Sequence, residues 1–144
     1  MLRLNVNAIV ENDQGKLLFI KLKKGPYVNK LSIPGGGLRF GEWSNQGAAR
    51  EIFEETGIKI PADSLRPIGF CELRNKSVKD HRVVLLLYGK GDGNPTDTEE
   101  ATAFWIHPYE VEDQLLPFAK EALQAYRNKK IHFKIDQDKK LCID

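Results

Sequence analysis

The amino-acid sequence predicts a mixed α/β fold arranged around one buried core. Strand-like runs rich in Val, Ile, Leu and Phe alternate with two segments of helical periodicity, and polar turns containing glycine or proline separate them. The chain has 144 residues, of which 41% are hydrophobic and 29% are charged. This length and composition fit one globular domain over residues 1–144, and they exclude a disordered polymer and a membrane bundle.

The first part of the chain is expected to supply strands. Residues 3–10 and 16–22 have the composition of two strands, and the polar turn between them ends at Gly15, which predicts a hairpin. Another strand-like run at residues 31–33 leads into residues 34–37, a proline followed by three glycines. Such a run predicts a loop.

Residues 44–56 have the periodicity of an amphipathic helix. Ser44 is able to cap the start of this helix, and Gly57 is able to cap its end. The face that packs on the core is expected to consist of Ala48, Ala49, Ile52, Phe53 and Thr56.

The second half of the chain continues the alternation of strands with a helix. The run at residues 82–88 is apolar enough to lie centrally in a sheet. A second helix is expected at residues 117–126, where a proline suits the first turn, and residues 131–144 are expected to form a terminal hairpin. The remaining strands are predicted at residues 68–73 and 103–106.

Charge and cysteine content narrow the classes of function. The formal charge of +2 is too small to indicate a protein that binds polyanions through its net charge. The two cysteines, Cys71 and Cys142, have neither metal-ligand spacing nor the density of a disulfide scaffold. No apolar run approaches the roughly 20 residues that span a bilayer. We therefore expect a soluble, cytoplasmic protein without a membrane partner.

The helix at residues 44–56 gathers negative charge on one flank. At roughly 100° per residue, Glu51, Glu54 and Glu55 lie together, with side chains about 5 to 6 Å apart at Cβ. Arg50 is placed to pair with Glu54, but one guanidinium cannot neutralise three carboxylates. A divalent cation with oxygen ligands can do so, and Mg²⁺ or Mn²⁺ is the natural candidate.

The glycine-rich run before the helix suits the same chemistry. Glycines allow the backbone to approach the helix closely, so that a carbonyl oxygen is available to the cation. An ion held in this way keeps several waters and binds phosphates. The pattern therefore favours hydrolysis of a phosphoanhydride bond over a purely structural metal.

The stretch from Gly36 to Ile58 resembles the signature of the Nudix hydrolase family, G-x5-E-x7-R-E-U-x-E-E-x-G-U, where U is aliphatic. Every specified position matches, through Gly36, Glu42, the Arg50-Glu51-Ile52 triplet, Glu54-Glu55 and Gly57-Ile58. The resemblance implies a Nudix-like α/β/α sandwich with a mixed β-sheet, with the signature forming a loop-helix-loop beside the sheet.

The resemblance also implies roles for individual residues. The metal ligands would be Glu51, Glu54, Glu55 and the carbonyl of Gly36, with Glu42 supporting them directly or through water. Arg50 would orient the glutamates; its plain alternative is a surface ion pair. The general base would come from within the signature, for which Glu54 is our choice, or from the acidic loop before the Trp-containing strand, where Glu100 is the candidate. That loop is equally readable as a solvated acidic turn.

Candidate substrate contacts flank the signature. Arg39 either touches a substrate phosphate or points to solvent. Flat aromatic rings stack well on nucleobases, although aromatic residues in strands more often belong to the core. The stacking candidates are Tyr27, Phe40, Phe70, Phe104 and Trp105.

These observations predict a divalent-metal-dependent hydrolase that acts on a nucleoside diphosphate linked to another moiety. Nucleoside triphosphates and nucleotide sugars are the favoured substrates. Some family branches that act on ADP-ribose or diadenosine polyphosphates carry a marker proline or tyrosine, and the residues near Arg74 offer neither. The alternatives are a nucleotide-sensing Nudix domain without turnover and an RNA 5'-end pyrophosphohydrolase. The family analogy also suggests a homodimer.

Overall fold

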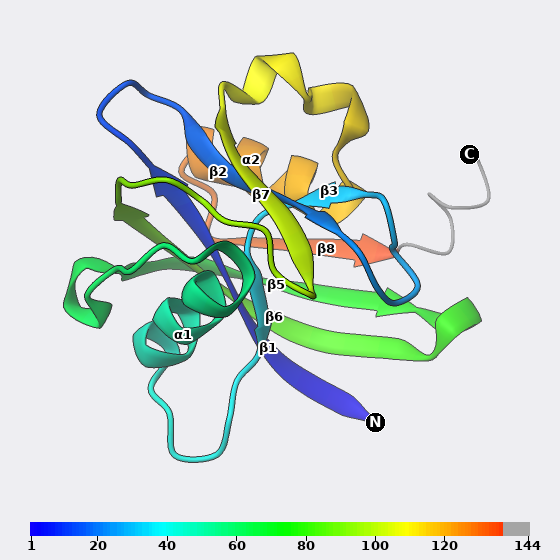
Figure 1. Cartoon of the computed structure of the whole chain (residues 1–144). Helices are drawn as coiled ribbons and strands as arrows, with labels where there is room; N and C mark the ends of the chain where they lie inside the picture. Colours follow the sequence, from blue (N-terminus) through cyan, green and yellow to red (C-terminus); the bar gives the residue numbers. More distant parts are fainter. Residues whose placement is uncertain (137–144) are drawn as a thin grey trace.

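Strand β1 (Leu2–Glu11) is the central strand of a mixed sheet in the computed structural model, which describes residues 1–136 (Figure 1). It runs parallel to β6 (Asp80–Lys90) along its full length, from Leu2 opposite His81 to Glu11 opposite Lys90. The main path of the sheet is β3-β2-β1-β6-β5-β8, with β4 on β1 and β7 on β2. The other strands are β2 (Leu17–Leu22), β3 (Leu31–Ser32), β4 (Gly35–Gly37), β5 (Arg66–Asn75), β7 (Ala101–Ile106) and β8 (His132–Asp136).

Two helices cover this sheet. Their bounds are Ser44–Thr56 for α1 and Pro117–Arg127 for α2, close to the predicted ranges. Short 3-10 turns occur at Ala62–Ser64, Lys76–Val78, Pro108–Glu110 and Glu112–Gln114. None of the helices among residues 1–136 is long and apolar enough to cross a membrane.

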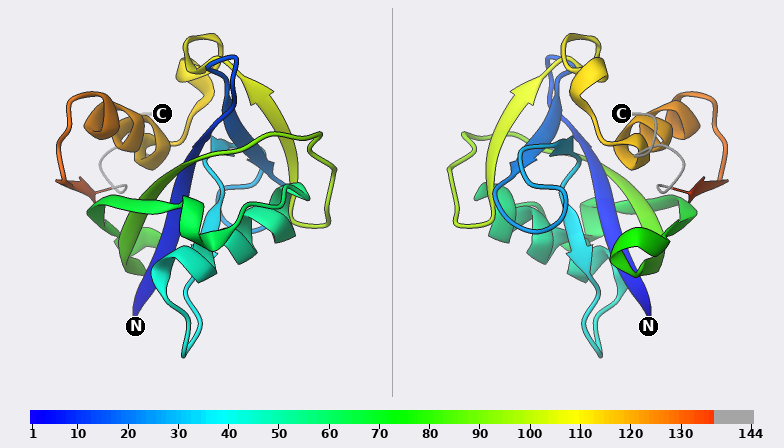
Figure 2. Two further views of the ribbon diagram at one scale, coloured as in Figure 1. Left: turned by 90° about the vertical axis from the view of Figure 1, so that its left-hand side faces the viewer. Right: turned by 90° about the vertical axis from the view of Figure 1, so that its right-hand side faces the viewer.

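The side chains of β1 alternate between two cores. Val6, Ala8 and Val10 pack with Ala48 and Ile52 of α1 in one buried cluster. On the other face of the strand, Ile9 belongs to the buried cluster that includes Ala119 and Ala122 of α2. Alternation of this kind is the two-residue period of a strand buried on both faces. The two helices therefore lie on opposite faces of the sheet (Figure 2), which is the α/β/α arrangement that the resemblance of the signature implies.

The predicted opening hairpin is present only at its turn. Glu11 pairs with Leu17, after which β2 leaves β1 and pairs along its whole length with β7, from Leu17 opposite Ile106 to Leu22 opposite Ala101. Because β2 diverges, the edge of β1 is open to another strand near its start.

The glycine run at residues 34–37 fills this edge, and the predicted loop is wrong here. Gly35, Gly36 and Gly37 form β4 and pair antiparallel with Asn7, Val6 and Asn5. A Cβ atom on Gly35 would lie 2.2 Å from the carbonyl oxygen of Val6. The absence of side chains allows this close approach, so the glycines here permit strand pairing.

Helix α1 differs from prediction at its start and along one margin. Trp43 is the N-cap, because its N–H donates to Oε1 of Gln46 at 3.0 Å, and Ser44 is the first helical residue. Gly57 ends the helix in the left-handed region, as predicted, with φ of 76°. Phe53 was expected in the core but is exposed, because the buried stripe runs through Ala48, Ile52, Glu55 and Thr56.

The C-terminal segment adds an edge strand. Strand β8 pairs parallel with β5, from Phe70 opposite His132 to Arg74 opposite Asp136. The predicted hairpin at residues 131–144 would need the chain beyond residue 136, which lies outside the described residues, as does Cys142. Cys71 is a buried free thiol, and β6 is central, between β1 and β5, as predicted.

Candidate metal centre and active site

Three carboxylates converge at the side of α1 that faces β4 and β7. Glu51 and Glu55 come from α1 and Glu100 from the loop before β7, and one oxygen from each lies within 4.8 Å of the others. The loop is held in place because Oγ1 of Thr98 accepts the N–H of Glu100 and the N–H of Ala101, both at 3.2 Å. Segments about 45 residues apart in sequence thus supply one acidic group.

Glu55 is the most buried member of this group. Its Oε1 accepts the N–H of Gly35 at 2.8 Å. Burial raises the pKa of Glu55 to about 9, an effect that the Gly35 hydrogen bond opposes and the charges of Glu51 and Glu100 reinforce. In the part of the chain that the structure describes, Arg50 pairs with Glu42, Glu51 and Glu54 but not with Glu55. A negative charge on Glu55 therefore needs another positive partner.

Glu51 is held between the glycine strand and an arginine. Burial raises its pKa, while the hydrogen bond and charge of Arg50 lower it. A Cβ atom on Gly36 would lie 2.4 Å from Oε2 of Glu51, so the backbone of Gly36 stands directly against this carboxylate. Two predicted ligands, Gly36 and Glu51, are thus brought together.

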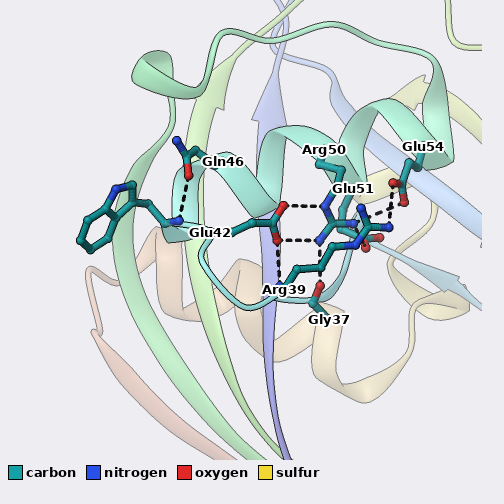
Figure 3. Close-up of polar contacts among 8 residues, drawn as sticks. Gly37, Arg39, Glu42, Gln46, Arg50, Glu51 and Glu54 are labelled. Atoms are coloured by element: carbon teal, nitrogen blue, oxygen red, sulfur yellow. Dashed lines mark hydrogen bonds and ion pairs between the residues drawn. The ribbon is translucent and has the colours of Figure 1, made fainter.

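Arg50 links the signature residues to one another (Figure 3). Its Nε and Nη2 donate to the two oxygens of Glu42 at 2.7 and 2.9 Å, and its Nη1 donates to Glu51 at 2.7 Å. Longer contacts reach Glu54 at 3.4 Å, and Nη2 also donates to the carbonyl of Gly37 at 2.9 Å. A planar guanidinium with five donors can hold several acceptors at once. Arg50 therefore fixes the direction in which Glu51 points.

Glu42 and Glu54 lie on the arginine side of the site. The hydrogen bonds of Arg50 are the main reason that the pKa of Glu42 falls to about 2. Glu54 faces the guanidinium groups of Arg39 and Arg50, each at 3.4 Å, and about a third of its side chain is exposed. Among the described residues, the converging group therefore contains Glu100 in addition to two of the predicted helix ligands, with Glu54 and Glu42 beside it.

The predicted substrate contacts are scattered. Phe40 is fully exposed on the loop before α1, and the exposed Arg39 reaches Glu54. Phe70 lies against the ring of His132, 4.7 Å between centroids, and Trp105 donates its Nε1–H to the carbonyl of Gly93 at 2.8 Å. Phe104 packs against the core on the α2 side.

Tyr27 lines a cavity of about 120 Å³ that opens beside the acidic group. Glu55, a member of the acidic group, lines this cavity together with Gly35 and Gly36. Its other walls include residues that the sequence analysis did not single out, namely Asn5, Asn7, Ser32, Arg82 and Phe118. The signal in the sequence was a pair of asparagines two residues apart among the otherwise apolar residues 4–10.

The carboxylate set has the chemistry of a cation site. The three side chains offer oxygen atoms only, which are the donors preferred by hard divalent cations. The site also brings like charges together in partly buried positions, an arrangement that a bound cation would relieve. The acidic group is therefore able to bind a metal ion.

Comparison with known proteins identifies the family. A family model described as "NUDIX domain" matches residues 1–128, which include the entire signature and all the converging carboxylates. The chain belongs to the Nudix hydrolase family. The predicted resemblance and the assignment to a family of hydrolases are confirmed by this match.

Individual Nudix relatives are similar to the chain at moderate identity. A "MutT-like protein" of Streptomyces ambofaciens is 28% identical over 111 residues, which cover 77% of this chain and 68% of that protein. The ADP-ribose pyrophosphatase of Methanocaldococcus jannaschii is 42% identical over 60 residues, 42% of this chain and 35% of that protein. The chain thus matches about a third of the length of the second relative.

A solved structure supports the fold over most of the chain. The NUDIX domain of Shewanella oneidensis NrtR, determined with ADP ribose, matches with a TM-score of 0.76 and 16% identity, and the match covers 90% of this chain and 88% of that chain. At this level of sequence identity, the match supports similarity of fold only.

Proposed function

We propose that this protein is a divalent-metal-dependent pyrophosphohydrolase that cleaves a phosphoanhydride bond in a nucleoside diphosphate linked to another moiety. The observation that carries the proposal is the convergence of Glu51, Glu55 and Glu100 within 4.8 Å, in a group of which Glu55 also lines a cavity. Carboxylates alone suit a cation, and a cavity beside them suits an organic group attached to the phosphates.

The cation is proposed to be Mg²⁺ or Mn²⁺, held by Glu51, Glu55 and Glu100 with the carbonyl of Gly36. When bound, such an ion lowers the pKa of a water ligand and neutralises charge on the phosphates. Arg50 holds Glu51 in position, and Glu42 serves through Arg50. In this assignment Glu42 does not bind the ion itself but holds Arg50, which positions Glu51.

Glu54 is proposed as the general base. It lies on the same flank of α1 as the ligands, it is partly exposed to water, and Arg50 and Arg39 fix its carboxylate. Water attacks one phosphorus, its proton passes to Glu54, and the P–O bond to the departing phosphate group breaks. Arg39, which is exposed beside Glu54, is placed to bind a phosphate oxygen.

The organic end of the substrate is proposed to be a nucleoside. Tyr27 and Phe118 supply flat rings to a cavity whose other walls combine aliphatic side chains with polar ones, and such walls suit a nucleobase. Nucleoside triphosphates and nucleotide sugars are the favoured substrates. The name of the M. jannaschii relative adds ADP-ribose to that set. We propose that the protein acts in the cytoplasm, where these nucleotides are available.

An assay panel tests the proposal. The protein is incubated with Mg²⁺ and with nucleoside triphosphates, nucleotide sugars, ADP-ribose or a 5'-triphosphate RNA, and the phosphate, pyrophosphate and monophosphate products are separated by ion-exchange chromatography. We expect cleavage of at least one small nucleotide, loss of activity in EDTA and recovery with Mg²⁺. If the protein cleaves no phosphoanhydride in the panel, the proposed hydrolase activity is refuted. If the protein prefers the 5'-triphosphate RNA, then RNA rather than a small nucleotide is its substrate.

A further inference from the structure

Two asparagines of β1 line the same cavity but differ in their hydrogen bonding. Asn5 and Asn7 are two residues apart, so they share one face of the strand, and both are buried, with 5% and 9% exposed. Nδ2 of Asn7 donates to the carbonyl of Ile33 at 3.0 Å. Oδ1 of Asn5 is buried and has no hydrogen-bond donor among the described residues.

The strand itself does not need a polar side chain at position 5. The backbone of Asn5 is in register with Gly37 of β4 on one side and Val84 of β6 on the other, so both edges are paired. Asparagine is disfavoured in strands, and a buried acceptor without a partner costs about 1–3 kcal/mol. A branched apolar residue would fill this position more stably.

The charged neighbour in the cavity does not satisfy Asn5. Arg82 also lines the cavity, but its guanidinium is bound to the buried carboxylate of Asp80, with Nε at 2.9 Å from Oδ1. Asn5 lines the cavity, so its unpaired acceptor lies beside a space that a ligand can enter. Buried polar groups in native proteins usually have a hydrogen-bond partner, and a molecule in the cavity would be able to supply one here.

We propose that Oδ1 of Asn5 is a specificity-determining contact that accepts a hydrogen bond from an N–H group on the edge of the substrate's nucleobase. The inference rests on the proposed function, because it takes the occupant of the cavity to be a nucleoside. The phosphates belong with the carboxylates, of which Glu55 lines the cavity, so the base is the part of the substrate that occupies the rest of the cavity, which Asn5 also lines. Nucleobases carry amino or imino N–H donors on their edges.

The test compares N5L with the matched control N7L. Binding of AMP, GMP, CMP and UMP is measured by calorimetry with Mg²⁺, and imidodiphosphate is the probe that has phosphates but no base. N5L is expected to weaken the best-bound nucleotide about 10- to 100-fold, because an unmade buried hydrogen bond costs about that much. Its affinity for imidodiphosphate is expected to match that of the wild type.

Thermal unfolding without ligand separates recognition from structure. N5L is expected to unfold at the wild-type temperature or above, because it removes an unpaired acceptor, whereas N7L unfolds at a lower temperature because the carbonyl of Ile33 loses its donor. If N5L does not fold, N5A provides the same binding comparison with a smaller side chain.

Three results would overturn the inference. Equal nucleotide affinity in N5L and the wild type would remove Asn5 from recognition while leaving the proposed hydrolase intact. If N5L loses affinity for the nucleotide and for imidodiphosphate equally, Asn5 supports the structure of the whole site and does not recognise the base. If the wild type binds none of the four nucleotides and cleaves no phosphoanhydride, the proposed function fails and the inference fails with it.

Discussion

Gly36 of β4 and Glu51 of α1 are in such close contact that a Cβ atom on Gly36 would lie 2.4 Å from Oε2 of Glu51. The other oxygen of this carboxylate accepts a hydrogen bond from Arg50 at 2.7 Å, so any displacement of Glu51 disturbs that bond. The glycine of the signature is therefore required by the position of an acidic side chain, and the strand pairing of β4 with β1 keeps the two together.

The variant G36A tests this relationship, with G37A as its control. The added methyl group must push Glu51 away, so we expect the Mg²⁺ concentration for half-maximal activity to rise about 10- to 100-fold. A Cβ atom on Gly37 has no neighbour within 4 Å, and G37A is expected to keep the Mg²⁺ affinity of the wild type. Titration of activity and of binding heat with Mg²⁺ measures both. Equal affinities in the two variants would contradict the contact.

Glu100 and Glu99 form a second matched pair. Both are exposed and adjacent, but only Glu100 belongs to the group that includes Glu51 and Glu55. E100Q is expected to weaken Mg²⁺ binding about tenfold or more, because one of the three carboxylate ligands loses its charge, whereas E99Q should match the wild type. If the two variants behave alike in calorimetric Mg²⁺ titrations, Glu100 is not a ligand.

E54Q separates the general base from the ligands. Loss of a general base lowers kcat by about 10²- to 10⁴-fold, and the amide preserves the shape of the side chain. We expect this fall in kcat with unchanged thermal unfolding and a change in Mg²⁺ affinity smaller than that in E100Q. Near-normal turnover in E54Q would show that Glu54 is not the general base.

R50K examines the orienting role of the arginine. A lysine ammonium cannot reproduce the simultaneous contacts of Arg50 with Glu42, Glu51 and the carbonyl of Gly37. We expect kcat/KM to fall about 10- to 100-fold, as when a residue that positions metal ligands is lost. R127K, at an exposed pair with Glu112, is the control and should keep full activity. Full activity in R50K would show that Arg50 forms an ordinary ion pair and does not orient the metal ligands.

Asp80 should make the stability of the protein depend on acid pH. Burial would raise the pKa of this carboxyl, but Arg82, together with hydrogen bonds from Tyr27 and Arg3, outweighs burial and lowers it. Because the pKa in the folded protein is below that in the unfolded chain, about 3.9, the stabilisation is complete above that value. It is lost as the pH falls through the pKa of the folded state.

The variant D80N measures this contribution. At pH 7 we expect it to unfold with about 3 kcal/mol less free energy than the wild type, because two arginines lose a buried partner. The difference should shrink below about pH 4. Urea unfolding at pH 7 and at pH 3 tests both points, with the exposed Asp113 changed in D113N as the control, expected to be within about 0.5 kcal/mol of the wild type. If the difference in unfolding free energy between D80N and the wild type is larger at pH 3 than at pH 7, the lowered pKa of Asp80 is contradicted.

The elements that the sequence predicted correctly depend on local patterns. The limits of α1 and α2 follow from helical periodicity, and the central position of β6 follows from its uninterrupted apolar run. The errors occur where residues distant in sequence decide the outcome. The three glycines became a strand because β1 offered an unpaired edge, and Phe53 is exposed because the packing on β1 rotated the buried stripe of α1 toward Glu55.

The sequence by itself determined the family signature, its acidic helix flank and the reach of Arg50 to its neighbours, because these depend on spacings within one helix and the loop before it. Only the tertiary structure decided that Glu100 joins Glu51 and Glu55, and that Asn5 faces a cavity with its acceptor unpaired. Those relationships join segments that chain folding brings together, and side-chain spacing along the sequence carries no information about such approaches.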